Sequence, residues 1–198
     1  MPAVERATVG VLALQGDVAE HLRALQESGA ARAVPVRTLQ ELEQVDALLL
    51  PGGESTTIGK LMVEGRLDTA IRRRVQDGMP VFGTCAGLIL LATDIIGSEQ
   101  PRLGLLPARV RRNAFGRQVD SFETALAVPS LDAEPLPAVF IRAPVVEAVA
   151  PEVEVLAEFD GKPVLCRHGR VLAATFHPEL TADRRLHRFF LSFLEKQP

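Results

Sequence analysis

The chain has 198 residues, of which 47% are hydrophobic and 24% are charged, enough apolar side chains for one domain with a sizeable core. Its formal net charge of -3 provides no broad positive field, which argues against nucleic acid or an anionic membrane as the main partner. The apolar run near the N-terminus is too short for a signal peptide, and no later segment approaches the length of a membrane span. We therefore expect a cytoplasmic protein.

The first half of the chain alternates apolar strands with helices. Residues 8–14 form a β-branched apolar run, and a helical pattern with Asp17 as a plausible N-cap follows over 17–29. Further strands are expected at 33–37, 46–50 and 80–84, and further helices at 55–62 and 67–78. Continuous apolar strands that alternate with helices are typical of a parallel sheet covered on both faces.

Residues 103–175 have a different character. Short strand candidates follow one another there, separated by Pro, Gly and Asp, and they either extend the same sheet or form a side sheet. A final helix is expected over 181–197, with Thr181 as its cap. No linker or internal repeat is visible. We therefore predict a single α/β domain over 1–198, with a mostly parallel central sheet flanked by helices and with extra antiparallel strands.

Cys85 stands where a strand gives way to a helix, at the sheet edge where α/β proteins bind ligands. Gly83 and Gly87 flank it as glycines flank the serine of Gly-x-Ser-x-Gly, which predicts a tight, exposed turn that projects a nucleophile. The helix N-terminus favours a thiolate and offers the Ala86 amide as an oxyanion donor. The alternative is an ordinary buried cysteine, the role that we assign to Cys166. A disulfide between the two is not expected in a reducing cytoplasm.

A thiolate nucleophile needs a base, and the chain has four histidines. His21 and His187 fall within amphipathic helices and are predicted to be half-exposed, while His168 lies in the sequence Arg-His-Gly, which favours a hairpin turn. His177 instead follows an apolar strand and is followed closely by Glu179, whose carboxylate could orient the ring. A strand end that simply leads into a helix is the alternative for this segment.

The stretch LLLPGGEST, residues 48–56, carries two glycines directly after a buried strand. Such a turn can direct backbone N–H groups toward a ligand, and Gly53 could supply a second oxyanion donor. The alternative is a plain loop in which Ser55 or Thr56 caps the next helix. The stretch is not a Walker loop, because the Gly-Lys-Ser/Thr ending is absent.

Three motifs in this order, PGGES, GTCAG and FHPE, resemble those of the class I (triad) glutamine amidotransferases. More narrowly, LALQGDVAEH, LPGGESTTIGKL, RNAFGRQVDSFE, FIRAP and AATFHPEL are similar to the glutaminase subunits of pyridoxal 5'-phosphate synthases. The resemblance runs from near residue 8 to the C-terminal helix. The three short motifs specify only the superfamily, whereas RNAFGRQVDSF and ESTTIGKL point to the vitamin B6 branch.

The resemblance implies a flavodoxin-like fold and the hydrolysis of L-glutamine. In that chemistry Cys85 attacks the side-chain carboxamide, His177 protonates the leaving ammonia and Glu179 supports the imidazole. The amides of Gly53 and Ala86 hold the oxyanion. The residues that the resemblance assigns to glutamine recognition are Gly52, Gly53, Glu54, Arg112, Ile141 and Arg142.

The resemblance also implies a protein partner, a (β/α)8-barrel synthase subunit that consumes the ammonia. It implies no cofactor and no metal on this chain, because pyridoxal phosphate forms on the partner. Docking near Gln15 and Gly16 is expected to switch on a weakly active free chain. Asp17 departs from the family pattern, in which a small apolar residue is expected at this position of the partner-facing surface.

Two other functions compete with this interpretation. The chain could be a glutaminase that serves another acceptor, as in imidazole glycerol phosphate synthase, or a scaffold of the same fold without catalysis. The RNAFGRQVDSF segment argues against the first, and the presence of Cys85, His177 and Glu179 argues against the second.

Overall fold

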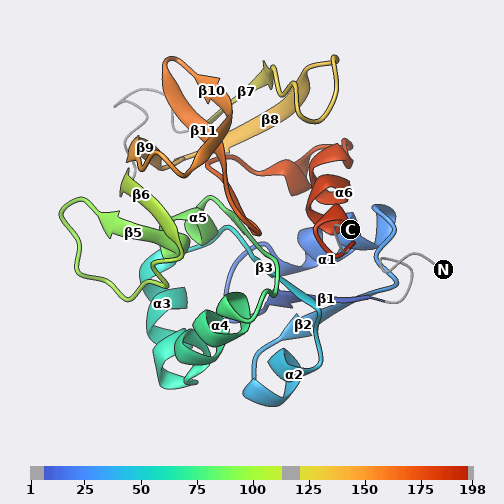
Figure 1. Cartoon of the computed structure of the whole chain (residues 1–198), viewed down its shortest axis with the longest axis vertical. Helices are drawn as coiled ribbons and strands as arrows, with labels where there is room; N and C mark the ends of the chain where they lie inside the picture. The colour runs from blue at the N-terminus through green and yellow to red at the C-terminus, as the bar shows by residue number, and fades with distance from the viewer. Residues whose placement is uncertain (1–6, 113–120, 196–198) are drawn as a thin grey trace.

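A computed structural model describes residues 7–112 and 121–195 of the chain (Figure 1). Its strands are β1 (Thr8–Leu12), β2 (Arg32–Val36), β3 (Ala47–Leu50), β4 (Val81–Thr84), β5 (Ala92–Ile95), β6 (Leu106–Arg111), β7 (Ser121–Leu126), β8 (Leu136–Ile141), β9 (Val145–Val149), β10 (Glu154–Phe159), β11 (Lys162–His168) and β12 (Val171–Ala174). Its helices are α1 (Val18–Glu27), α2 (Leu39–Glu43), α3 (Ser55–Glu64), α4 (Leu67–Gln76), α5 (Ala86–Leu91), the short 3-10 helix η2 (Pro178–Leu180) and α6 (Arg185–Ser192).

The main sheet has seven strands in the order β10-β11-β12-β4-β3-β1-β2. The five strands from β12 to β2 run parallel, and β10 and β11 continue the sheet in antiparallel fashion. Strands β4 and β12 are direct neighbours, with Thr84 opposite Ala174. The residues that follow these two strands therefore emerge side by side at one edge of the sheet.

Both faces of the main sheet are covered, which explains the continuous apolar runs of its strands. Every residue of β3, β4 and β12 is buried. Leu48 and Leu50 point into an apolar cluster shared with α3, α4 and α5, whereas Leu49 between them points into a second cluster shared with α1 and α6. The parallel sheet flanked by helices is therefore confirmed.

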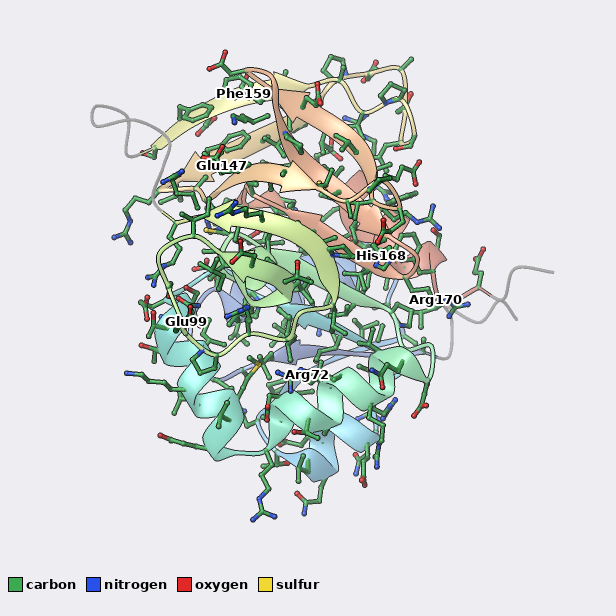
Figure 2. All side chains as sticks on the ribbon, turned by 60° about the vertical axis from the view of Figure 1, so that its left-hand side comes forward. Arg72, Glu99, Glu147, Phe159, His168 and Arg170 are labelled. Carbon is green, nitrogen blue, oxygen red and sulfur yellow. The ribbon has the colours of Figure 1, made fainter. Side chains whose placement is uncertain are left out.

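The region from 103 to 175 forms more than one sheet. Strands β10 and β11 extend the main sheet, while β5-β6-β9 and β7-β8 form separate small sheets, and Figure 1 shows β7 and β8 beside β10 and β11. Glu147 on β9, labelled in Figure 2, accepts hydrogen bonds from Arg111 on β6 at 2.9 Å and from Lys162 on β11 at 2.8 Å. Both expected arrangements of these strands thus occur together.

The final helix begins later than the sequence indicates. Residues 178–180 form η2 instead, and the backbone N–H of Arg185 bonds the Asp183 carboxylate at 2.9 Å at the start of α6. Thr181 is therefore not its cap, because its hydroxyl accepts from the Asp183 N–H in the preceding bend. Within the described ranges, no helix combines the length and the apolar character needed to cross a membrane.

Candidate active site

Cys85 occupies a strained turn between β4 and α5. Its φ of 48° and ψ of -102° lie outside the regions that L-residues usually adopt, and its N–H donates to the Ala174 carbonyl at 2.8 Å. A Cβ on Gly87 would lie 2.1 Å from the carbonyl oxygen of Leu50, so only glycine lets α5 pack this closely on β3. The turn expected from the sequence is present, but it is not exposed, because only 8% of Cys85 is accessible.

The His177 ring lies beside Cys85 and between two carboxylates. Its Nδ1 atom is 2.7 Å from Oε1 of Glu179 and 3.4 Å from Oδ2 of Asp17. Glu179 has a side chain with no accessible surface, whereas Asp17 is 39% exposed. Because Nδ1 faces the carboxylates, Nε2 is the ring nitrogen left to exchange a proton with the thiol. The structure therefore brings together Cys85, His177 and Glu179, and it adds Asp17.

The charges around His177 favour its protonated form. Burial opposes this, but hydrogen bonds with Asp17, Cys85 and Glu179 outweigh it and raise the pKa of His177 above its usual value. Burial raises the pKa of Glu179, and the hydrogen bond to His177 counteracts part of that rise. The ligand atoms of Asp17, His177 and Glu179 lie within 4.8 Å of one another, and we assign this closeness to hydrogen bonding around one imidazole nitrogen.

The loop after β3 is held by the loop after β1. Gly53 has a φ of +151°, and a Cβ there would lie 2.6 Å from the Gln15 side-chain oxygen. That oxygen accepts from the Glu54 N–H at 2.7 Å, and the Gly52 carbonyl accepts from the Asp17 N–H at 3.1 Å. The orientation of the Gly52–Gly53 peptide therefore depends on residues 15–17.

Glu54 and Arg112 form an ion pair at the start of α3. The Arg112 Nη2 donates to Glu54 Oε1 at 2.9 Å, and Nη1 donates to Gln100 Oε1 at 2.8 Å and to the Thr56 hydroxyl at 2.9 Å. Glu54 also caps α3 by accepting from the Thr57 N–H, so neither Ser55 nor Thr56 is the cap. These hydrogen bonds hold the Arg112 side chain in place. The rest of its motif, which includes Asn-Ala-Phe-Gly, falls in residues 113–120 and lies outside the described residues.

One cavity of about 340 Å³ brings these groups together. At its wall, the Ile141 carbonyl oxygen lies 4.0 Å from Cys85 Sγ, and Arg142 follows with a φ of 42°. Of the residues predicted from the sequence, the cavity is lined by Gly53, Glu54, Cys85, Ala86, Arg112, Ile141, Arg142 and His177. Gly52 and Glu179 are not in the lining, and both lie directly behind His177.

Comparison with known proteins places the chain in a family. The model of the SNO glutamine amidotransferase family matches residues 11–196. The chain belongs to the SNO glutamine amidotransferase family. It is 56% identical over 186 residues to a protein of Moorella thermoacetica named pyridoxal 5'-phosphate synthase subunit PdxT, covering 94% of this chain and 98% of that one. A protein of the same name from Thermus thermophilus is 58% identical over 188 residues, covering 94% and 97%.

Solved structures agree with this membership. A crystal structure described as a glutamine amidotransferase superposes with a TM-score of 0.90 at 55% identity, covering 94% of this chain and 98% of that one. A structure described as PurLQS from Thermotoga maritima has a TM-score of 0.67 at 16% identity, covering 95% and 98%, which shows a shared fold alone. The single-domain α/β fold of the class I glutamine amidotransferases is thus confirmed.

Several residues that line the cavity beside Cys85 were not among the site residues predicted from the sequence. Gln15, Asp17, Ser55, Ile89 and Leu180 also line it. The position of Gln15 and Asp17 after β1 was a usable signal, because β1 ends at the same sheet edge as β3 and β4. Asp17 precedes α1 as expected, yet its side chain makes no capping bond.

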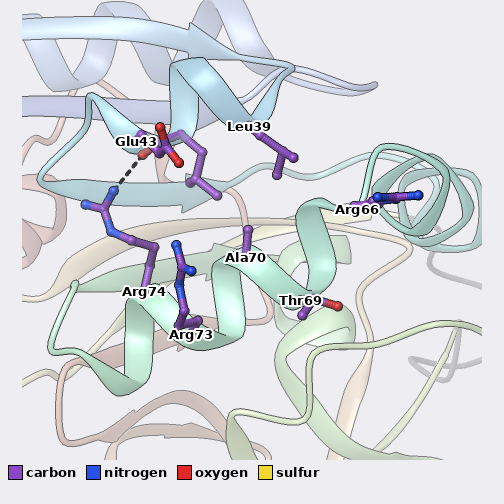
Figure 3. Close-up of a pocket in the computed structure, with 8 residues that line it drawn as sticks. Leu39, Glu43, Arg66, Thr69, Ala70, Arg73 and Arg74 are labelled. Carbon is purple, nitrogen blue, oxygen red and sulfur yellow. Dashed lines mark hydrogen bonds between the residues drawn. The ribbon is translucent and has the colours of Figure 1, made fainter.

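A second cavity of about 360 Å³ lies between α2 and α4, away from Cys85 (Figure 3). Leu39 and Ala70 form part of its wall, with Arg66, Arg73 and Arg74 around it. Arg74 donates to the main-chain oxygens of Leu42 at 2.9 Å and Val45 at 2.6 Å. Arg74 therefore serves the C-terminal end of α2, and this cavity shares no lining residue with the one that Cys85 and His177 line.

His21 and His187 are fully buried, which corrects the expectation that both are half-exposed. His21 on α1 and His187 on α6 lie on the inner faces of their helices, 3.3 Å apart from Nδ1 to Nε2. Burial lowers the pKa of His21 well below its usual value, and burial with the charge of Arg184 lowers that of His187 to about 3. Cys166 is buried as expected, and burial with the charge of Glu158 raises its pKa to about 12.

The lowered pKa of His187 predicts a specific dependence of stability on pH. Below about pH 6.5 the unfolded chain binds a proton at His187, whereas the folded chain leaves this histidine neutral. Protonation therefore favours the unfolded chain, and the free energy of unfolding falls as the pH decreases from about 6.5. The loss approaches about 1.4 kcal/mol per pH unit. We expect urea unfolding between pH 6.5 and 5 to show a shallower pH dependence for His187→Leu than for the wild type. Equal slopes would contradict the lowered pKa.

Proposed function

We propose that this chain is the glutaminase subunit of a pyridoxal 5'-phosphate synthase and that residues 1–198 form one glutaminase domain. The observation that carries the proposal is the meeting of Cys85 and His177 beside a fixed arginine in one cavity, with Glu179 bonded to His177 from behind. Relatives at 56% and 58% identity carry the name of that synthase subunit over nearly their whole length, which supports the choice of substrate and pathway.

The proposed reaction begins from the ion pair in which the Cys85 proton already resides on His177 Nε2, the protonated form of His177 that its hydrogen-bond partners favour. The thiolate attacks the side-chain carbonyl carbon of L-glutamine, and the resulting oxyanion accepts from the amides of Ala86 and Gly53. His177 then gives its proton to the leaving nitrogen, and ammonia departs from a thioester. Water deprotonated by His177 cleaves the thioester and releases L-glutamate and the free thiol. Glu179 keeps Nδ1 protonated throughout.

The charged groups of the cavity suit the two ends of a free amino acid. Arg112 offers a planar guanidinium to the α-carboxylate, and Glu54 offers a carboxylate to the α-ammonium. The two side chains pair with each other in this structure, so substrate binding requires them to exchange part of that contact. Ile141 and Arg142 line the same cavity, where the Ile141 carbonyl oxygen lies 4.0 Å from Cys85 Sγ.

The remaining parts of the proposal concern the setting of the reaction. We assign the ammonia to a (β/α)8-barrel synthase subunit that docks on this chain. Two free thiols, Cys85 and Cys166, suit the reducing cytoplasm. The direct test is release of glutamate and ammonia from L-glutamine by the purified chain with the synthase subunit, with L-asparagine, one methylene shorter, as the comparison substrate. Absence of glutamate release would reject the proposal.

Arg112→Ala is expected to raise the KM for glutamine by about 10- to 100-fold, the equivalent of about 1.5 to 3 kcal/mol for a hydrogen bond to a charged group. The effect on kcat should be smaller, because the guanidinium contacts a part of the substrate that does not react. Arg109→Ala is the matched control. Arg109 lies on β6, which ends one residue before Arg112, and its side chain is 60% exposed and paired at 2.9 Å with Asp94 outside the cavity. An unchanged KM in Arg112→Ala would remove this arginine from the site.

A further inference from the structure

A chain of buried polar side chains lies behind the candidate triad. His21 Nε2 is 3.3 Å from Glu179 Oε2 and 3.0 Å from the Thr84 hydroxyl. On its other side, His21 Nδ1 is 3.3 Å from His187 Nε2. His21, Thr84 and His187 have no accessible surface, and neither does the side chain of Glu179. These contacts join α1 near the start of the sequence, β4 in its middle, and η2 and α6 near its end.

The two carboxylate oxygens of Glu179 face different imidazoles. Oε1 bonds His177 Nδ1 at 2.7 Å, whereas Oε2 faces His21 Nε2. An ionised carboxylate only accepts hydrogen bonds, so the His21 proton belongs on Nε2. The Nδ1 atom of His21 is then an acceptor, and the Nε2–H of His187 donates a hydrogen bond to it. In this arrangement the single Nε2–H of His21 is shared between the Thr84 hydroxyl at 3.0 Å and Oε2 of Glu179 at 3.3 Å, an oxygen that has no other hydrogen-bond partner among the described residues, while Nδ1 of His187 stays without a partner there.

We propose that His21 is a positioning residue for glutamine hydrolysis, in which its Nε2–H holds the far oxygen of Glu179 while His187 fixes the tautomer of His21. This inference rests on the proposed function, since it concerns how that chemistry is supported. A carboxylate with an imidazole nitrogen facing each of its oxygens resists rotation away from His177. The imidazole also contacts Thr84, the residue before Cys85, so one side chain braces both sides of the site.

The charges near this chain of contacts set the direction of the expected effects. Glu179 is faced by His177 and by Asp17, and His187 is faced by Arg184. Neutral His21 stabilises only the ionised form of Glu179. Removal of its N–H therefore favours protonation of that carboxylate, which disables the triad. The acidic limb of the activity profile should move to higher pH.

The experiment compares His21→Gln with His21→Asn in the complex with the synthase subunit. The amide of glutamine can reach the place of Nε2, whereas that of asparagine reaches only the place of Nδ1. We expect His21→Asn to lower kcat by about 10- to 100-fold, leave the KM for glutamine unchanged and shift the acidic limb to higher pH. His21→Gln should recover most of the rate. His168→Gln is the control, because His168 lies on β11 outside this chain of contacts (Figure 2).

Two results of this comparison would overturn the proposal. One is a wild-type rate and pH profile in His21→Asn. The other is an equal loss in both variants with an unmoved acidic limb, since that pattern means that the imidazole only fills space. A thermal unfolding curve would reveal a variant that fails to fold. In that case the proposal is tested by NMR of the wild-type protein, which needs no substitution of His21.

Nitrogen NMR of the imidazole rings tests the same arrangement without any activity. In the wild type, His21 and His187 should both be neutral Nε2–H tautomers between about pH 5 and 8. Glu179→Gln should shift the His21 ring nitrogens far more than those of His168. A protonated Nδ1 on neutral His21 would overturn the proposal even in an active enzyme. A wild type that hydrolyses no glutamine would reject the proposed function, while these spectra still decide the role of His21.

Discussion

Cys85→Ala should abolish glutamine hydrolysis, lowering kcat by a factor on the order of 10⁴ to 10⁶. Loss of the attacking sulfur removes the thioester route, and no other thiol lies in the cavity among the described residues. Because Cys85 is buried, truncation also leaves a small void, so we expect a stability loss of about 1 kcal/mol with the fold retained. Initial rates of glutamate release and a thermal unfolding curve measure the two effects.

Cys166→Ala is the matched control for this experiment. Cys166 is fully buried on β11 and lies in the core instead of the cavity. It should lose stability to a similar degree while keeping its activity. If Cys85→Ala kept most of its rate, the nucleophile would have to be sought elsewhere.

The synthase subunit should raise the glutaminase rate of the chain by a factor of about 10² to 10³, which is the factor in kcat that one oxyanion donor usually contributes. The Gly52–Gly53 peptide is tied through its carbonyl to the Asp17 N–H, and the neighbouring Glu54 N–H is tied to Gln15. A partner that moves residues 15–17 would therefore reorient that peptide. The change needed is one that points the Gly53 N–H at the oxyanion.

This activation is measured by titrating the synthase subunit into an assay at saturating glutamine. Background hydrolysis is controlled by the same titration with Cys85→Ala. A free chain already at full rate, and indifferent to the partner, would refute the gating mechanism. It would instead favour a hydrolase that works alone.

The sequence revealed those parts of the site that depend on local order along the chain. Cys85 directly follows the buried strand β4, and His177 comes three residues after the end of the buried strand β12. Because parallel neighbours end at the same sheet edge, their meeting could be predicted. The loop at Gly53 was recognised by the same reasoning. The family resemblance, not the pattern, pointed to Arg112.

Burial of polar residues could not be predicted in the same way. His21 and His187 occupy helices whose apolar stripes suggested partial exposure, and only the packing of α1 and α6 against the sheet places both rings behind Glu179. The contact of Asp17 with His177 likewise depends on how the loop after β1 approaches the segment that follows β12, two strands that are not neighbours in the sheet. Such contacts arise from tertiary packing, for which a single sequence carries no periodic signal.

The pairing of β4 with β12 has a consequence for engineering this chain. The spacing between Cys85 and His177 is set by two adjacent strands of one sheet, with Gly83 opposite Ala173, although a long stretch of sequence separates them. An insertion at an exposed turn of that stretch, such as the one at Asp132–Glu134, leaves this register untouched. Affinity tags or fluorescent reporters could therefore be placed inside the polypeptide, and both termini would remain free for fusion to other proteins.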